Sequence, residues 1–239
     1  MFWRNSVSHE PSAEEVDHVN QEIEDREHEF RANCDDGEGD PMACHSWGEW
    51  LTVVEKDYTS AANVYRKNCE EKCYAASCFN LGRLMLAGKG VEENDEKALE
   101  LFERSCAKKH AQACHHAGFM YLEGIGTPKD VLRGLAGLKT ACKLDDAGSC
   151  SRVGSLYLDP PAMENGEQSE LLQRDPIRAK KYYAKACDAN FAPACYNLAV
   201  MFKNGDTGVE KNEKMYEEYK KKTEQLVKQA KGMLGVKVA

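Results

Sequence analysis

Five segments of this 239-residue chain align without gaps, and each begins with a small residue followed by a cysteine. The segments span residues 43–54, 77–88, 113–124, 149–160 and 194–205. Counting from the cysteine, a glycine or alanine stands at offset four and a large apolar residue at offset seven. These offsets fall on one face of an α-helix. An internal repeat of this kind constrains the fold more than composition does.

A second helix is predicted after each of the first four segments, and it ends at another cysteine. A large residue stands four positions before that cysteine and a small one eight positions before it. The large residues are Tyr65, Phe102, Leu138 and Tyr183. The first of the two helices is called helix A below and the second helix B. The sequence therefore predicts an all-α, right-handed alpha-solenoid of TPR-like helix-turn-helix repeats.

One solenoid domain over residues 1–239 accounts for the whole pattern. The predicted units are an N-terminal half-repeat helix (12–34), repeats 1 to 4 (41–75, 76–111, 112–147 and 148–192), and repeat 5 with a capping helix (193–232). A loop at 160–176 is inserted in repeat 4, because the last step between equivalent cysteines is longer than the others. Insertions in solenoids usually fall in exposed loops.

Ten of the eleven cysteines fall into local pairs that join the end of a helix B to the start of the next helix A. The pairs are Cys34 with Cys44, Cys69 with Cys78, Cys106 with Cys114, Cys142 with Cys150, and Cys187 with Cys195. Facing Cα atoms of packed antiparallel helices lie roughly 4 to 6 Å apart, which suits disulfides. The alternative is ten reduced, buried thiols. Cys73 remains as a free thiol.

The net charge of −8 makes nucleic acid an unlikely class of partner, since no long basic surface is expected. No apolar run reaches the 18 residues of a membrane span or forms a signal-peptide core, so a soluble chain without membrane insertion is expected, as a monomer. Eleven cysteines without a secretory signal are unusual in a reducing compartment. Either the compartment is oxidising by another route, or the thiols are reduced.

The pattern A-C-x-x-L-G-x-x-Y-x-x-G followed by K-A-x-x-L-F-x-x-S-C, best seen at residues 76–106, resembles the Sel1-like repeats of cysteine-rich solenoid proteins. The half-repeat start, the five repeats and the Cys-x9-Cys beginning resemble the eukaryotic Sel1-repeat assembly factors for cytochrome c oxidase. This resemblance implies a disulfide-stabilised, protein-binding scaffold in the mitochondrial intermembrane space. It also implies oxidative import without a cleavable signal. Partners on the concave face would be respiratory-complex subunits or other assembly factors.

Candidate chemistry is sparse. His115 could ligate haem, but no zinc-type ligand spacing or Cys-x-x-Cys motif occurs, so no metal site or catalytic residue is predicted. Ser105 and Lys108 match a Ser-x-x-Lys element, which we interpret as chance because its partner motifs are missing. An enzyme is therefore less favoured than a scaffold. The alternatives are a haem-binding thiol-disulfide reductase and a cytosolic Sel1 adaptor with reduced cysteines.

Overall fold

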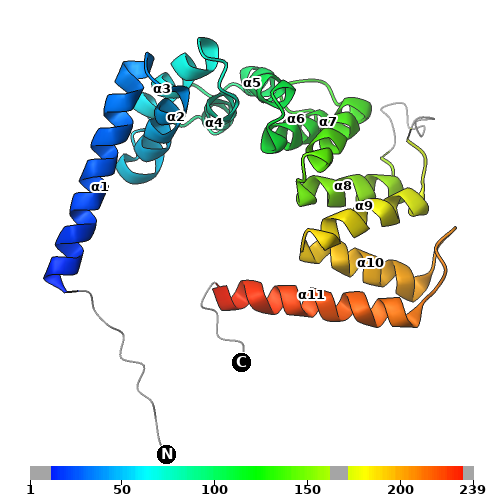
Figure 1. Ribbon diagram of the computed structural model, residues 1–239. Helices are drawn as coiled ribbons and strands as arrows, with labels where there is room; N and C mark the ends of the chain where they lie inside the picture. The colour runs from blue at the N-terminus through cyan, green and yellow to red at the C-terminus, as the bar shows by residue number, and fades with distance from the viewer. Residues whose placement is uncertain (1–11, 162–171, 234–239) are drawn as a thin grey trace, which may run out of the picture.

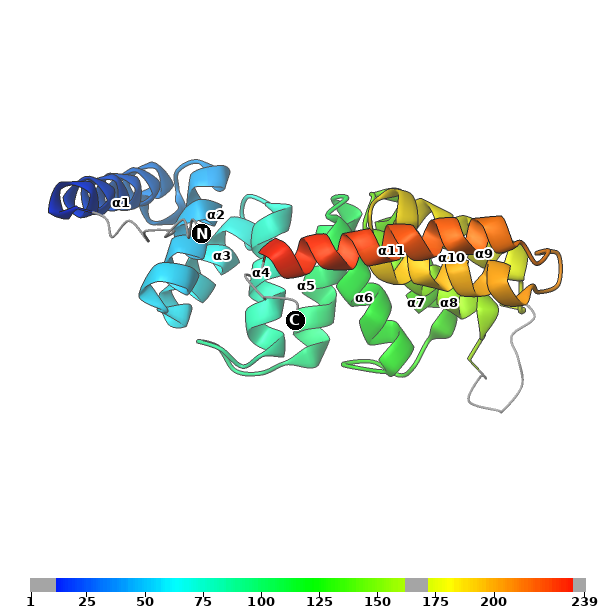
Figure 2. The same ribbon diagram turned by 90° about the horizontal axis from the view of Figure 1, so that it is seen from below.

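The computed structural model describes residues 12–161 and 172–233. Its helices follow one another along an arch with α1 and α11 at the two ends (Figure 1). Seen from below, the repeats form a single row (Figure 2). The described residues hold no strand beyond one isolated bridge between Asp206 and Val209. The predicted all-α solenoid is confirmed.

Helices A are the even-numbered helices from α2 to α10, and helices B are the odd-numbered ones. The bounds are α1 Ala13–Cys34, α2 Pro41–Trp50, α3 Tyr58–Glu70, α4 Ala75–Leu86, α5 Asp95–Ala107, α6 Ala111–Glu123, α7 Val131–Lys143, α8 Ala147–Leu158, α9 Pro176–Asp188, α10 Ala192–Asn204 and α11 Glu213–Met233. The helices α4 and α6 lie nearer the hollow of the arch than α5 and α7 (Figure 1). Helices A therefore line the concave side there.

Most helices begin at a side chain that accepts a hydrogen bond from a backbone N–H of the first turn. Such a bond satisfies one of the four unpaired donors at a helix start. The residues that cap helices in this way are Ser12, Asp40, Asp57, Asn94, His110, Asp130, Asp146, Asp175 and Asn212. The B-to-A turns after Cys106, Cys142 and Cys187 each contain one residue in the left-handed region, namely Lys109, Asp145 and Asn190. Short polar caps and tight turns thus set the repeat length.

The glycine at offset four of helix A lets the large residue of helix B pack directly on the helix backbone. A Cβ added at Gly82 would lie 2.9 Å from the Phe102 ring, and one at Gly154 would lie 2.9 Å from the Tyr183 ring. Both rings are buried. In these two repeats helices A and B therefore interlock through a ring placed against a glycine.

Two features differ from the sequence expectation. After α2 the chain continues as a π-turn, η2 (Leu51–Glu55), which closes at Lys56 in the left-handed region. At the other end, the last helix B and the predicted capping tail form one continuous helix, α11. No glycine or proline lies between residues 213 and 231 to interrupt the helix.

The inserted loop 160–176 lies mostly outside the described residues. Its described end carries Leu172, which is buried in the core of the C-terminal repeats. Arg174 then makes a two-pronged contact with Asp206, at 3.0 and 2.6 Å, so the end of the insertion is tied to the turn before α11. The repeat boundaries given above stay a prediction.

Candidate protein-binding surface and its disulfide frame

The ten aligned cysteines lie in five disulfides, each between the end of a helix B and the start of the next helix A. The bonds join Cys34 with Cys44, Cys69 with Cys78, Cys106 with Cys114, Cys142 with Cys150, and Cys187 with Cys195. The Cα atoms within a pair are 4.4 to 4.8 Å apart. The two cysteines of each disulfide are 8 to 10 residues apart in the sequence, so each bond closes a short loop. The redox state of these cysteines in cells stays a proposal.

Cys73 lies apart from this frame. It is exposed in the turn between α3 and α4 and carries a positive φ of 52°. The neighbouring Lys72 uses its ammonium group to reach the backbone carbonyl of Glu38 at 2.7 Å. The turn is thus held through its lysine, and the thiol faces solvent.

Consecutive helices A contact one another through a polar pair that recurs two repeats apart. The residue after the cysteine in one helix A meets the serine before the cysteine in the next. His45 Nδ1 lies 3.3 Å from Ser77 Oγ, and His115 Nδ1 lies 2.7 Å from Ser149 Oγ. His115 also lies 3.5 Å from Asp146. These histidines therefore help to set the rotation between neighbouring repeats.

The predicted haem ligand His115 thus has one ring nitrogen engaged in this inter-repeat contact. The adjacent His116 points to a different neighbour and packs against Phe79 and Phe102, with ring centroids 5.2 and 5.1 Å away. Among the described residues, no group of three or more histidine, cysteine or acidic side chains has a geometry that could hold a metal ion. A haem role for His115 stays a hypothesis.

An aromatic cluster forms where α4, α5 and α6 meet, and it contains His110 and His116. The His110 ring lies 4.7 Å from that of Phe79, and its Nδ1 accepts a hydrogen bond from the backbone N–H of Ala113. Burial lowers the pKa of His110, and the positive charges that His45 and His116 would carry lower it further. Burial likewise lowers the pKa of His116. The cluster is therefore most stable with neutral imidazoles.

The Ser-x-x-Lys element cannot act as a nucleophile in this structure. Ser105 has no exposed surface, and its hydroxyl donates a hydrogen bond of 2.7 Å to the carbonyl of Ala75. Lys108 lies outside, at the C-cap of α5. The interpretation of this motif as chance agrees with that burial.

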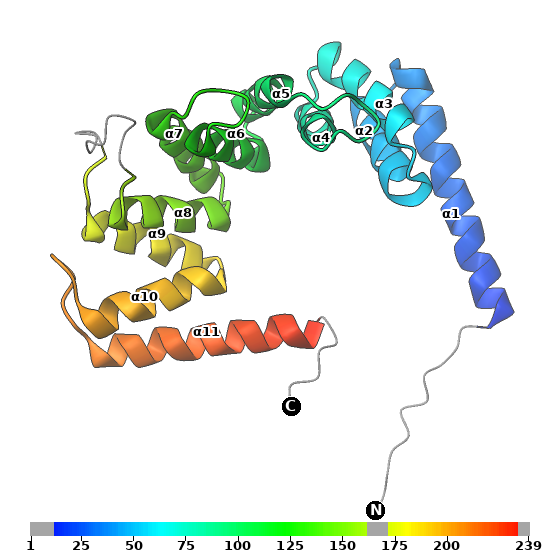
Figure 3. The same cartoon turned by 180° about the vertical axis from the view of Figure 1, so that it is seen from behind.

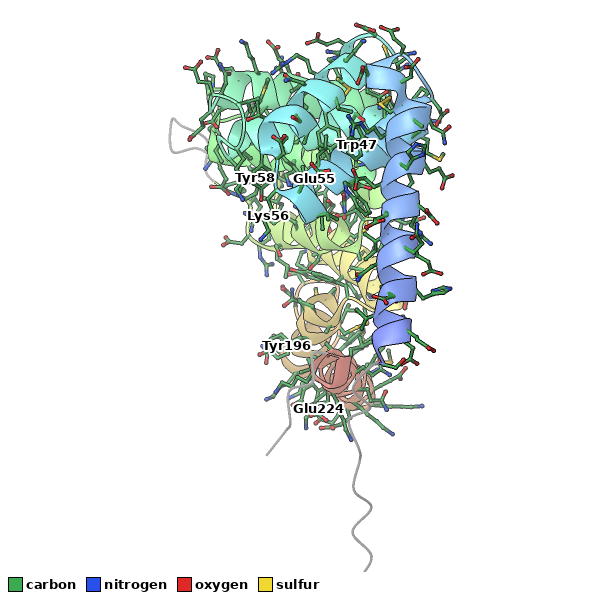
Figure 4. All side chains as sticks on the ribbon, turned by 90° about the vertical axis from the view of Figure 1, so that its left-hand side faces the viewer. Trp47, Glu55, Lys56, Tyr58, Tyr196 and Glu224 are labelled. Carbon is green, nitrogen blue, oxygen red and sulfur yellow. A yellow bond between two sulfur atoms is a disulfide. The ribbon has the colours of Figure 1, made fainter. Side chains whose placement is uncertain are left out.

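An open groove at the N-terminal end of the arch was not found from the sequence. It is lined by α1, α2, η2, α3 and α4, and its volume is about 610 Å³. Figure 4 views this end of the molecule, with Trp47, Glu55, Lys56 and Tyr58 labelled near the π-turn. The groove contains Phe30, Trp50, Val53, Val54 and Leu84, together with several polar groups. The π-turn that carries the two valines left no periodic signal in the sequence.

No helix in the described ranges combines the length and the apolar character needed to cross a bilayer. Solenoids of this type bind other molecules through such extended concave surfaces.

The family model described as Sel1 repeat matches residues 75–110, 111–146, 162–191 and 192–215. The chain belongs to the Sel1-repeat family. Its fold is that of a Sel1-repeat solenoid in which each disulfide links a helix B to the next helix A.

Several curated relatives carry one particular name. Cytochrome c oxidase assembly factor 7 of Danio rerio is 32% identical over 176 residues, which is 73% of this chain and 59% of that protein. The human protein of the same name is 31% identical over the same shares. The Drosophila melanogaster homolog is 31% identical over 222 residues, covering 81% of this chain and 83% of the relative. The match thus spans a little over half the length of the vertebrate relatives.

Solved structures show the same fold. A protective antigen of uropathogenic Escherichia coli strains, described as displaying an SLR fold, aligns with a TM-score of 0.69 at 22% identity, over 87% of this chain and 46% of that one. A Sel1 repeat protein from Oxalobacter formigenes aligns with a TM-score of 0.69 at 21% identity, over 88% and 81%. At these identities the likeness concerns the fold alone.

Proposed function

We propose that this chain is a disulfide-stabilised, protein-binding scaffold that acts in the assembly of cytochrome c oxidase in the mitochondrial intermembrane space. The observation that carries the proposal is the similarity to the Drosophila assembly factor homolog, which spans most of both chains. Ten cysteines at disulfide distance support an oxidising compartment. The concave row of helices A supports protein partners, such as respiratory-complex subunits or other assembly factors.

The first test measures the amount of assembled cytochrome c oxidase in mitochondria of the source organism after the protein is depleted. We expect less of the assembled oxidase on native gels and recovery on re-expression of the wild type. A Cys73→Ser variant serves as the control, because Cys73 lies outside the disulfide frame and its loss should leave recovery intact. Normal oxidase levels in the depleted cells would contradict the proposal.

The second test is the intact mass after alkylation of the non-reduced, denatured protein from its native cells. We expect one alkylated thiol, since Cys73 is the cysteine outside the five pairs. Alkylation of close to all eleven cysteines would instead support a cytosolic adaptor with reduced thiols. Protease protection of the tagged protein in intact and outer-membrane-ruptured mitochondria then distinguishes the compartments.

A further inference from the structure

The first half of helix α1 has an apolar face that no other helix of the described residues covers. This face carries apolar residues at intervals of three, four and seven positions, namely Val16, Val19, Ile23 and Phe30. Arg26 stands at the position of the same face between Ile23 and Phe30. The three aliphatic side chains are exposed, with Val16 at 42%. Spacing of this kind is the seam of a coiled coil, which normally faces a second helix. We call this face the α1 seam.

The rest of α1 shows why the seam is open. The helix packs against α2 and η1, and no other element of the described chain makes an extensive contact with it. From behind, the first half of α1 projects away from the other helices (Figure 3). An isolated row of aliphatic side chains in water is unfavourable, and covering it would release free energy of roughly 25 cal/mol per Å² of apolar surface.

The seam runs into the groove of about 610 Å³ described above. Phe30 belongs to both, and its ring meets that of Trp50 with a centroid distance of 6.4 Å. Val53 and Val54 extend the apolar surface from η2, and Val53 is 74% exposed. Seam and groove together are therefore one continuous surface, apolar along α1 and widening at α2 and α4.

The groove end of this surface has hydrogen-bond donors without acceptors. The indole N–H of Trp50 is shielded from solvent yet has no hydrogen-bond partner. Arg26 and Arg83 line the groove as exposed side chains, and the guanidinium carbon of Arg83 lies 5.7 Å from the centroid of the Phe79 ring. Glu49 lies 3.5 Å from His45. The two exposed guanidinium groups beside the Trp50 ring therefore suit a group that carries unpaired acceptors.

The flanks of the seam have the opposite character. Glu22 and Glu29 lie one position before the seam residues Ile23 and Phe30, and Glu27 follows Arg26 on the other side. Glu22 and Glu29 are exposed, and Glu27 is half-buried. In coiled coils, charges at these flanking positions select partners of opposite sign. The flanks therefore favour lysine or arginine on the occupant.

A single kind of occupant suits the apolar seam, the cationic groove end and the acidic flanks. A helix has unpaired carbonyl oxygens at its C-terminus and a partial negative charge there. We propose that the α1 seam and the adjoining groove bind an amphipathic helix of a partner protein, with an apolar stripe along α1, basic flanks, and its C-terminal end against Arg26, Arg83 and the Trp50 indole. This inference rests on the proposed role as a protein-binding scaffold and specifies the partner's chemistry.

The test uses two synthetic 21-residue helices that share leucines at the seam positions. One has lysine and the other glutamate at the flanking positions. We expect the lysine peptide to bind the full chain at least tenfold more tightly in calorimetry and to move the Trp50 indole N–H signal in NMR spectra. A nitroxide at the C-terminus of the peptide should broaden that signal, whereas one at the N-terminus should not.

Matched variants assign the binding to the seam. Val16→Lys should lower the affinity for the lysine peptide at least tenfold. Val227→Lys should leave this affinity unchanged, because Val227 lies on α11 and is equally exposed, at 41%. Equal binding of both peptides, or equal loss in both variants, would overturn the proposal. So would a dimer of the free protein that Val16→Lys dissociates, because a second copy would then be the occupant. If the peptides do not bind while the wild type still restores cytochrome c oxidase, only the seam assignment fails.

Discussion

Single glycines decide how closely helices approach, most clearly between α6 and α7. A Cβ at Gly118 would lie 2.9 Å from the carbonyl oxygen of Gly134 and from the backbone nitrogen of Leu138. We expect Gly118→Ala to lower the free energy of unfolding by about 1 to 3 kcal/mol, because the backbone of α7 must move away. Gly148→Ala is the control, since its nearest neighbour is 3.6 Å away, and urea unfolding of the two variants provides the comparison. Equal stabilities would contradict the packing argument.

The protonation of His110 should tune stability in mildly acidic solution. Its pKa is lower in the folded protein, so the unfolded chain takes up the proton first as the pH falls below about 6.5, and the free energy of unfolding decreases. Protonation also removes the Nδ1 acceptor that caps α6. His110→Asn keeps a neutral capping group, so its melting temperature should fall less between pH 7 and pH 5 than that of the wild type. His18→Asn, an exposed site, should melt like the wild type, and an unchanged pH dependence in His110→Asn would refute this role.

At the residue scale the sequence predicted what repeats locally and missed what depends on rotation between repeats. The Cys, Gly and aromatic positions could be predicted because they share one helix face. The contact of His45 with Ser77 joins residues 32 apart, and it requires a particular angle between two helices A. The Trp50 donor could not be predicted for the same reason, since its surroundings come from α1 and α4 as well as from its own helix.

At the scale of elements, each disulfide fastens one helix B to the next helix A. Replacing Cys142 and Cys150 by serine should lower the free energy of unfolding by roughly 2 to 3 kcal/mol, because the unfolded chain regains the freedom of a short loop. Chemical denaturation without reductant measures the difference. In strong reductant the variant and the wild type should become similar, and a difference that persists there would mean that serine disturbs the packing instead.

Helix pairs and caps were predictable because polar caps and apolar periodicity are short-range signals. The π-turn η2 was not, since a one-residue widening at residues 51–55 leaves no periodic trace. The continuity of α11 was not predicted, because the capping helix was expected as a separate element after the last helix B. The α1 seam is exposed because no other described helix packs beside it, and sequence periodicity alone cannot predict this tertiary arrangement.

For the whole molecule, contacts run mainly between helices adjacent in the chain. Stability should therefore be local. Tyr65→Ala removes a buried ring that rests on Gly48, and we expect faster hydrogen exchange in α2 to α5 with unchanged protection in α8 to α10. Leu198→Ala should give the opposite distribution. Uniform loss of protection in both variants would show that the arch unfolds as one unit.

The five short disulfides also govern how the chain can reach its native pairing. Every native partner is the next aligned cysteine along the chain, 8 to 10 residues away, and loops this short close within about 100 ns, faster than longer ones. No bond has to wait for another to form, and none encloses another. An oxidant that meets the chain from one end could therefore form the five disulfides one after another, in the order of their cysteines along the sequence.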